Sequence, residues 1–403
     1  MSEPTPATVA LVGATGYGVQ HRRAIDALRD AGRVRLVAVC DTRPLSEEEV
    51  GPGVAVHTDH RAMLAAARPD VVVVSTPPHT HLPIALDALA AGADLLLEKP
   101  PVSSLADHDR LAHAVHDAGR VCQVGFQAQG SHALATLREA IGSGRLGQVT
   151  GVAAAGTWIR DDAYYARSPW AGRRLVEGRP VVDGALVNPF AHTLMLGLDL
   201  VRAAAPGAVP VRLTLERYRT REIEVEDTAC LRVEFTAGPP LLVAVTLSAG
   251  RFREGDMLVH GTAGSAVLEY PTDRLLLTTI DDPDRVAGGR PAAVPGAAVQ
   301  APRAERTGLL ANLLDHRRDP SGVALLAPLD ATRDFTALVE AILAAPAPTP
   351  VPAQHRRASG SGGSRAWVID GVDAAIATAA TTMTTYAELG LPWAAAPHEG
   401  TLA

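Results

Sequence analysis

The amino-acid sequence predicts two domains, an α/β domain built on a doubly wound parallel sheet and an α+β domain built on a large, mostly antiparallel open sheet. In the first part of the chain, short apolar runs alternate with amphipathic stretches, as parallel strands and crossover helices do. Beyond about residue 130, runs with period-two alternation follow one another without long helices between them, which is typical of antiparallel strands. The length of 403 residues accommodates two domains of ordinary size.

The first domain is expected to span residues 1–130. Its strands are identified by uniform apolarity, which indicates burial on both faces of a parallel sheet, and its helices by apolar positions that share one face. The expected strands are residues 8–12, 34–39, 71–74, 94–97 and 121–124, and the expected helices are residues 19–32, 61–67, 82–91 and 105–118.

The second domain is expected to span residues 131–403. Two segments rich in Pro, Gly and Ala, 282–302 and 345–365, are expected to be loops, and the second is expected to be flexible because it contains the run ASGSGGS. Helices are expected at residues 133–141 and 366–385, and strands at residues 149–158, 210–218, 222–236, 239–249, 255–262 and 265–279.

Composition excludes several classes of protein. Hydrophobic residues make up 47% and charged residues 20%, so the chain can bury enough apolar surface to fold. The net charge of -7 without a long basic run argues against a nucleic-acid partner, and no apolar stretch is long enough to span a membrane. The N-terminus lacks the pattern of a secretory signal, and three widely spaced cysteines, Cys40, Cys122 and Cys230, suit a reducing compartment. A cytoplasmic globular protein is expected.

The segment Gly13-Ala14-Thr15-Gly16-Tyr17-Gly18 lies between an expected strand and an expected helix. Glycines there let the backbone turn and approach a pyrophosphate, which the helix N-terminus attracts. Thr15 stands where the pattern G-x-G-x-x-G has its second glycine. Asp41, at the end of the next strand, could accept hydrogen bonds from ribose hydroxyls and favours NAD. Arg43 could instead bind the 2′-phosphate of NADP, so both cofactors stay open.

Lysine and arginine together number 37, yet only Lys99 is a lysine, which leaves 36 arginines. The two residues are not interchangeable, because only lysine readily loses its proton when buried. Lys99 could therefore be needed for proton chemistry, and the alternative is that one lysine has survived by chance. The loops with Lys99 and with residues 75–81 follow expected strands, and ligands of open α/β sheets bind at these strand ends.

Several short motifs recur along the chain at the expected strand ends and turns. They are the glycine loop followed by His21, Thr76-Pro77 with His81, Glu98-Lys99-Pro100, Gly125-Phe126, the run IGSGRLG at 141–147 and the run GTAGS at 261–265. Together these motifs resemble the Gfo/Idh/MocA oxidoreductases, the family of glucose–fructose oxidoreductase and inositol dehydrogenase. The resemblance covers roughly residues 8–345 and implies a Rossmann domain, a large open sheet, a substrate held between that sheet and the nicotinamide, and a homodimer or homotetramer.

The resemblance also implies functional residues. It places Lys99 beside the nicotinamide and the reacting hydroxyl, and it matches Asn188 and His192 to an Asp and a His on one helix face. Asn188 can bind a hydroxyl but cannot accept its proton, and Asp183 is not at the matching position. The cofactor-binding residues expected are Gly13, Thr15, Gly16, Tyr17, Gly18, Asp41, Arg43, Thr76, Pro77, His81, Glu98, Lys99 and Gln127.

An aromatic and basic segment, residues 161–174, stands out because only 4% of the chain is aromatic. Tyr164, Tyr165, Trp170 and Arg173 could bind a sugar through flat apolar faces and a guanidinium. Some family members are thought to use a tyrosine as proton donor, so Tyr164 or Tyr165 could replace the missing acid. The alternative is a packed connection with Trp170 in the core.

The expected function is an NAD(P)-dependent dehydrogenase or reductase that interconverts a secondary alcohol and a ketone on a sugar, glycoside or cyclitol. Lys99 and His192 would transfer protons, and Asn188, Tyr164 and Tyr165 would orient hydroxyls. Two alternatives stay open, namely a redox-neutral NAD-dependent glycosidase and a non-catalytic dinucleotide-binding sensor. No metal is expected, because His57, His60, His79 and His81 lack partners at zinc-site spacing.

Overall fold

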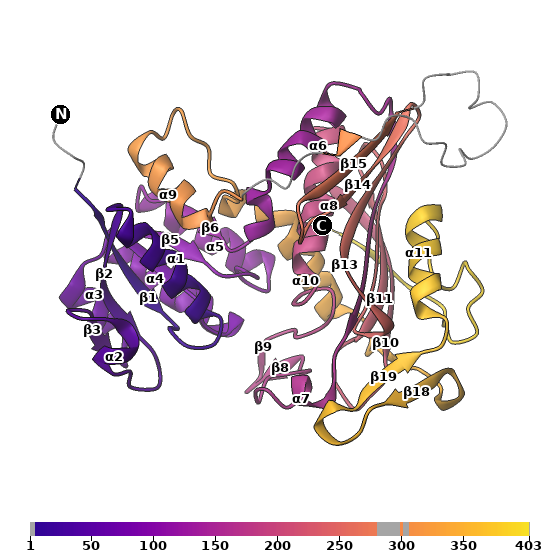
Figure 1. The fold of residues 1–403 in the computed structure, drawn as a ribbon, viewed down its shortest axis with the longest axis horizontal. Helices are drawn as coiled ribbons and strands as arrows, with labels where there is room; N and C mark the ends of the chain where they lie inside the picture. The colour runs from indigo at the N-terminus through magenta and orange to yellow at the C-terminus, as the bar shows by residue number, and fades with distance from the viewer. Residues whose placement is uncertain (1–4, 280–298, 301–305, 403) are drawn as a thin grey trace. The chain divides into compact units, whose positions relative to one another are not determined.

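The computed structural model describes residues 5–279, 299–300 and 306–402. The chain divides into two compact units, Met1–Gly130 with Thr307–Thr336, and Ser131–Arg306 with Ala337–Ala403. Figure 1 labels elements of both units where there is room. The predicted division placed 307–336 in the second domain, whereas the structure groups this segment with the first unit.

The first unit has a six-stranded parallel sheet in the order β3-β2-β1-β4-β5-β6. The predicted doubly wound sheet is confirmed, and its strand order reverses between β1 and β4. The strands are β1 (Ala7–Val12), β2 (Val34–Cys40), β3 (Ala55–His57), β4 (Val71–Val74), β5 (Asp94–Leu97) and β6 (Cys122–Val124). The helices are α1 (Gly18–Asp30), α2 (Glu47–Val50), α3 (His60–Ala67), α4 (His81–Ala90), α5 (Leu105–Asp117) and α9 (Leu309–Arg318), with the short 3-10 helices η1 (Pro78–Thr80), η2 (Gln127–Gly130) and η4 (Leu329–Thr332).

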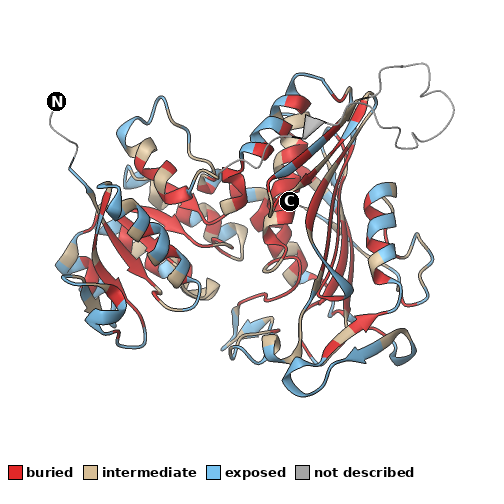
Figure 2. Ribbon diagram, viewed as in Figure 1, coloured by how far each residue is buried: buried red, intermediate tan, exposed pale blue. Residues whose placement is uncertain are grey.

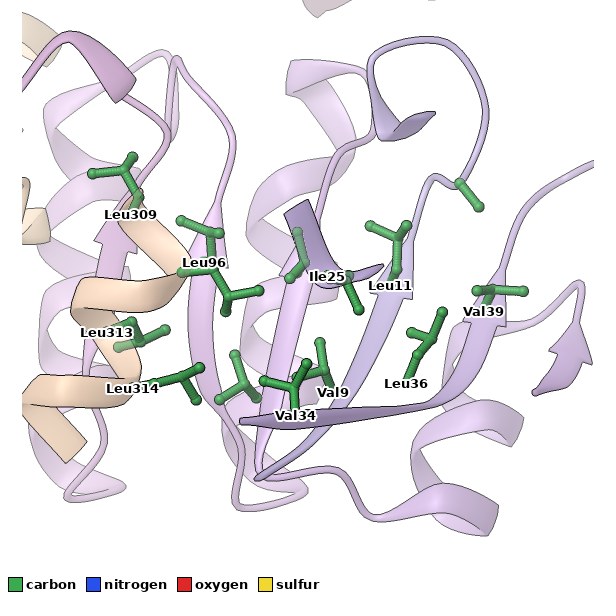
Figure 3. Close-up of a cluster of buried hydrophobic side chains, with 14 of the residues drawn as sticks. Val9, Leu11, Ile25, Val34, Leu36, Val39, Leu96, Leu309, Leu313 and Leu314 are labelled. Carbon is green, nitrogen blue, oxygen red and sulfur yellow. The ribbon is translucent and has the colours of Figure 1, made fainter. Parts of the chain in front are cut away.

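The returning segment joins the first unit because α9 completes its core. Leu309, Leu313 and Leu314 are buried in one cluster with Leu96 and the apolar side chains of β1 and β2, as Figure 3 shows. The Val124 amide of β6 donates to the Ala327 carbonyl at 2.8 Å. Local periodicity cannot indicate which sheet a distant helix will cover, so the sequence division missed this return.

The second unit is built on a ten-stranded sheet in the order β16-β15-β14-β13-β7-β12-β11-β10-β17, with β20 also paired to β10. Most neighbours are antiparallel, as predicted, and the pairs β7–β12 and β10–β17 are parallel. Two small hairpin sheets, β8–β9 and β18–β19, lie outside it. The strands are β7 (Val149–Ile159), β8 (Leu175–Val176), β9 (Arg179–Pro180), β10 (Pro210–Arg219), β11 (Thr228–Phe235), β12 (Leu241–Thr246), β13 (Ser248–Gly261), β14 (Gly264–Glu269), β15 (Arg274–Thr279), β16 (Val299–Gln300), β17 (Thr349–Pro350), β18 (Arg356–Ser359), β19 (Ala366–Ile369) and β20 (His398–Thr401).

Helices cover both faces of this sheet. Figure 1 shows α8 and α11 on opposite sides of the strands, and both pack on β7, β12 and β13. Figure 2 shows that the central strands are buried, whereas the outward side of α11 is exposed. The helices are α6 (His132–Gly142), α7 (Asp162–Tyr165), α8 (Ala191–Ala204), α10 (Arg333–Ala344) and α11 (Val372–Thr382), with η5 (Ala353–His355) and η6 (Gly362–Ser364).

Three predictions for the second domain are corrected. The predicted helix at 366–385 begins as strand β19, because these residues pair with β18, and the helix starts only at Val372. The predicted loop at 345–365 contains β17 and β18. The predicted strands 239–249 and 255–262 left residues 250–254 between them, whereas this stretch is a bulged part of β13, where the register with β7 shifts. The predicted loop at 282–302 lies outside the described residues, apart from β16.

Candidate active site

The glycine loop between β1 and α1 leaves no room for a side chain at Gly13 and Gly18. A Cβ atom on Gly13 would lie 2.1 Å from the Ser75 carbonyl oxygen, and one on Gly18 would lie 1.9 Å from the Gly13 oxygen. Gly13 also has a φ of 84°, in the left-handed region that favours glycine. These two glycines therefore let the loop pack closely against itself and the end of β4, at the N-terminus of α1.

Asp41 fastens this loop to the end of β2. Its Oδ2 atom accepts hydrogen bonds from the Ala14 amide, the Thr15 amide and the Thr15 hydroxyl, each at 2.9 Å. Its Oδ1 atom has only longer contacts, 3.3 Å from the Arg43 amide and 3.5 Å from the Thr42 hydroxyl. Burial raises the pKa of Asp41, but these hydrogen bonds outweigh it and hold the pKa below its ordinary value. Oδ1 is thus the oxygen that could accept a hydrogen bond from a ribose hydroxyl.

Arg43 already has a carboxylate partner. Its guanidinium lies 2.8 Å from Glu49 Oε1, and Glu49 is held by a capping box with Ser46 at the start of α2. The hydrogen bond from Arg43 lowers the pKa of Glu49 to about 2. Glu49 thus offsets the positive charge of Arg43, which would otherwise attract the 2′-phosphate of NADP. The pairing therefore favours NAD. Sequence reasoning missed Glu49, although the spacing Ser-x-x-Glu could have indicated the capping box.

His81 links the loops that follow β4 and β5, because its ring contacts a carbonyl oxygen in each of them. Its Nδ1 atom lies 2.8 Å from the Pro100 oxygen and its Nε2 atom 2.8 Å from the Thr76 oxygen. The side chain is fully buried. Thr76 and Pro77 belong to the loop before η1, so the structure gathers these predicted cofactor-site residues with the Glu98-Lys99-Pro100 loop at one edge of the sheet.

Glu98 is a buried carboxylate that organises the neighbourhood of Lys99. Its Oε1 atom lies 2.9 Å from His21 Nε2 and accepts from Gln127 Nε2 at 2.8 Å, and its Oε2 atom accepts from the Lys99 amide at 3.1 Å. Burial raises the pKa of Glu98, but the hydrogen bond from His21 and the nearby charges lower it below its ordinary value. Tyr17 packs edge-on against His21, with ring centroids 5.6 Å apart. Glu98 thus fixes the backbone of Lys99, which is itself half-buried.

The predicted pairing of Asn188 and His192 on one helix is wrong. Helix α8 begins at Ala191, so His192 lies in its first turn and Asn188 lies in the preceding turn. Pro189 explains the difference, because the residue before a proline disfavours helical backbone. The ring of His192 lies 6.5 Å from that of Tyr270 in the same unit.

Asp183, which sequence reasoning set aside, contacts Asn188 directly. The Asn188 Nδ2 atom donates to Asp183 Oδ1, and Arg167 donates to both carboxylate oxygens at 2.9 and 2.8 Å. The side chain of Asp183 is fully buried. Only its five-residue separation from Asn188 hinted at this contact, and the intervening turn could not be predicted from periodicity.

The aromatic segment forms a stacked cluster with arginines. The Arg167 guanidinium lies 3.8 Å from the Tyr164 ring and 4.8 Å from the Trp170 ring, and Arg221 lies 4.4 Å from the Tyr165 ring. Burial raises the pKa of Tyr164 to about 12 and that of Tyr165 well above its ordinary value, which favours an orienting role over proton donation near neutral pH.

Arg173, predicted to contact the substrate, is more exposed and pairs with Glu224 at 2.6 Å. Among the described residues, no group of three or more His, Cys, Asp or Glu side chains could hold a metal ion. Within the same residues, the helices are too short or too polar to cross a membrane.

Comparisons with known proteins agree with both units. Residues 7–126 match a family model described as "Oxidoreductase family, NAD-binding Rossmann fold", and residues 134–267 match the GFO/IDH/MocA C-terminal domain. Inositol 2-dehydrogenase 1 of Saccharopolyspora erythraea is 31% identical over 273 residues, which cover 66% of this chain and 74% of that protein. The chain belongs to the Gfo/Idh/MocA oxidoreductase family.

Other members of the Gfo/Idh/MocA family are more distant. D-glucoside 3-dehydrogenase of Escherichia coli is 28% identical over 204 residues, which cover 49% of this chain and 56% of that protein. The structure of a levoglucosan dehydrogenase in complex with NADH superimposes with a TM-score of 0.68 at 19% identity, covering 84% of this chain and 96% of that one. The chain spans about half the length of several curated relatives, from 41% to 58%.

Proposed function

We propose that this Gfo/Idh/MocA protein is an NAD-dependent oxidoreductase that interconverts a secondary alcohol and a ketone on a sugar, glycoside or cyclitol. One observation carries the proposal. The chain's only lysine follows Glu98, whose carboxylate is held by His21 and Gln127, in the same unit as a glycine loop that has no room for a side chain at Gly13 or Gly18. A homodimer or homotetramer is part of the proposal.

The residues of the first unit fit a dinucleotide. The glycine loop would receive the pyrophosphate, Asp41 Oδ1 the ribose hydroxyls, and the loops joined by His81 the nicotinamide end. NAD over NADP is supported by the pairing of Arg43 with Glu49. Bound NAD would accept or supply hydride, and the protein would contribute orientation, proton transfer and exclusion of water.

In this proposal Lys99 removes the proton of the reacting hydroxyl, or returns it in the reductive direction, as a general base or acid. Glu98 holds its backbone in place. His192 is the second proton carrier, since histidine titrates near neutrality. Asn188, Tyr164 and Tyr165 would orient the other hydroxyls.

The test follows nicotinamide absorbance with NAD or NADP and a panel of myo-inositol, methyl glucosides and levoglucosan. The wild-type protein should reduce NAD with at least one of them. Lys99→Arg and Lys99→Ala should lower turnover by ~100-fold or more, the scale of lost acid–base catalysis. Arg110→Ala, which removes an exposed cation from α5, is the matched control and should leave turnover unchanged.

Near-normal turnover in Lys99→Arg would contradict the role of Lys99 as general acid or base. Release of free sugar without net cofactor reduction would indicate the redox-neutral glycosidase instead. Dinucleotide binding with neither reaction would indicate the sensor.

A further inference from the structure

The orientation of the Asn188 side chain is determined by its partner. Asp183 is a carboxylate and can only accept hydrogen bonds, so the atom of Asn188 that faces it must be the Nδ2 donor. The Oδ1 atom of the amide therefore points away from Asp183. An unpartnered amide could rotate by half a turn and exchange its donor for its acceptor, whereas this one cannot do so without losing the bond.

Asp183 cannot move to release Asn188. Arg167 binds both of its oxygens, and the Gly172 amide donates to Oδ2 at 2.8 Å. The backbone is held as well, because the Asp183 amide donates to the Arg173 carbonyl at 3.1 Å. Arg167 is in turn stacked between Tyr164 and Trp170. The carboxylate is fixed in position, and its charge is balanced by one guanidinium.

The turn that carries Asn188 is fixed from its other side by Glu226. The buried Glu226 Oε1 atom accepts from the Leu186 amide at 3.2 Å. A Cβ atom on Gly184 would lie 2.3 Å from that same oxygen, so the turn and the carboxylate are in close contact. The Asn188 amide also donates to the Gly184 carbonyl at 3.0 Å. Backbone and side chain of Asn188 are therefore both held in one arrangement.

We propose that Asp183 is a positioning residue that holds Asn188 Oδ1 as an uncharged acceptor for a hydroxyl of a neutral polyol. The inference rests on the proposed function and deepens it. An acceptor oxygen suits a hydroxyl donor and repels a carboxylate or phosphate at the same place. Arg167 is occupied by Asp183, so it does not attract an anion here. The substrate group that Asn188 meets is a neutral hydroxyl.

The test compares Asp183→Asn, Asn188→Asp and the double exchange Asp183→Asn/Asn188→Asp. Binding of myo-inositol, methyl glucoside and levoglucosan is measured by saturation-transfer NMR with NADH present, and kcat and KM are measured wherever turnover occurs. NADH affinity and the melting temperature are followed in parallel. Glu388→Gln is the matched control, because Glu388 is likewise bound by an arginine, Arg232, through both oxygens and by a backbone amide.

Each single variant should weaken polyol binding or raise KM by ~10-fold, about the effect of one lost hydrogen bond, while NADH affinity stays unchanged. Asp183→Asn removes the carboxylate that accepts from the amide at 188, and Asn188→Asp sets two carboxylates against each other. The double variant restores one amide donor facing one carboxylate, so its defect should be smaller than the sum of the two single defects. Glu388→Gln should leave polyol binding unchanged.

Wild-type polyol binding in Asp183→Asn would overturn the inference. So would additive defects in a folded double variant, or the absence of polyol binding in the wild-type protein. If polyols bind but no cofactor is reduced, the proposed function fails while the binding series still decides the role of Asp183. If Asp183→Asn does not fold, the role of Asp183 is tested with Asn188→Asp and Asn188→Ala instead. Unchanged polyol binding in both of these variants would overturn the inference.

Discussion

Five buried carboxylates, two in the first unit and three in the second, differ in the direction of their pKa shifts. In the first unit, burial raises the pKa of Asp41 and of Glu98, but hydrogen bonds outweigh it and both values fall below the ordinary range. In the second unit, burial dominates at Glu216, Glu226 and Asp227 and their pKa values are raised. The difference lies in the balance, at each group, between burial and the donors and charges that surround it.

Glu98 and Glu216 illustrate the contrast. Glu98 has donors at 2.8 to 3.1 Å from two side chains and one amide. Glu216, in β10, accepts from the Ala387 amide at 3.1 and 3.3 Å, from the Tyr218 hydroxyl at 3.2 Å and from the Thr385 side chain. Glu98 has the charges of His21 and Lys99 beside it, which lower its pKa, whereas Glu216 has the negative charge of Glu388, which raises its pKa. Nearby cations therefore let the hydrogen bonds outweigh burial at Glu98, and burial prevails at Glu216.

The largest expected effect comes from separating the glycine loop from its surroundings. Gly13→Ala would place Cβ 2.1 Å from the Ser75 oxygen, so the backbone must shift and pull the loop from Asp41. A cost of about 2 kcal/mol corresponds to a loss of ~30-fold in NAD affinity, measured by NADH fluorescence titration. Gly142→Ala, where nothing lies within 4 Å of the added atom, should bind NADH normally. Equal affinities in the two variants would contradict the close approach.

A pair of isosteric substitutions sharpens the comparison. Glu98→Gln places the NH2 group of the new side chain opposite the Lys99 amide or His21, which are themselves hydrogen-bond donors to Glu98. The substitution should therefore lower the free energy of unfolding by about 1–3 kcal/mol. Glu216→Gln removes a poorly solvated charge and keeps an acceptor for Ala387, so it should change the free energy of unfolding by less than about 1 kcal/mol. Urea denaturation at neutral pH measures both. A larger loss in Glu216→Gln than in Glu98→Gln would reverse the interpretation.

The smallest expected effect is an opposite pH dependence of stability in the two units. Groups with raised pKa values bind protons preferentially in the folded state, so the second unit should gain stability as pH falls from 7 toward about 5. Groups with lowered pKa values stabilise the fold above about pH 4, the ordinary carboxyl value. Their contribution is lost only as pH falls through the folded value. Burial lowers the pKa values of His81 and His108 in the first unit, so the unfolded state binds protons more readily at these residues and the first unit should lose stability as pH falls below about 6.5.

The chain itself offers separate probes for this measurement. All four tryptophans lie in the second unit, whereas Cys40 and Cys122 are buried in the first. Urea denaturation followed by tryptophan fluorescence reports the second unit. Labelling with dithiodipyridine in a Cys230→Ala variant reports the first, because the third buried thiol, Cys230, lies in the second unit. Glu216→Gln should flatten the pH dependence of the second unit alone. Parallel pH profiles in both units would contradict the pKa directions.

Much of the first unit could be predicted from the sequence because its signals are local. The glycine loop, the apolar run at 71–74 and the Glu98-Lys99-Pro100 segment each lie within a few residues and follow a strand. The fold class of both units is confirmed by the sheets. The return of α9 to the first core and the strand at 366–369 were missed, because their partners are chosen by packing and pairing with other segments.

The sequence by itself determined the alternation of strands and helices, the family and the residues that stand at strand ends, since these follow from composition and short motifs. Only the tertiary structure decided what those residues contact. It shows that Asp41 fastens the glycine loop, that Glu49 pairs with Arg43 and that Asn188 donates to Asp183. The physical reason is that hydrogen bonds and ion pairs depend on where turns and loops bring atoms together, which no periodicity encodes.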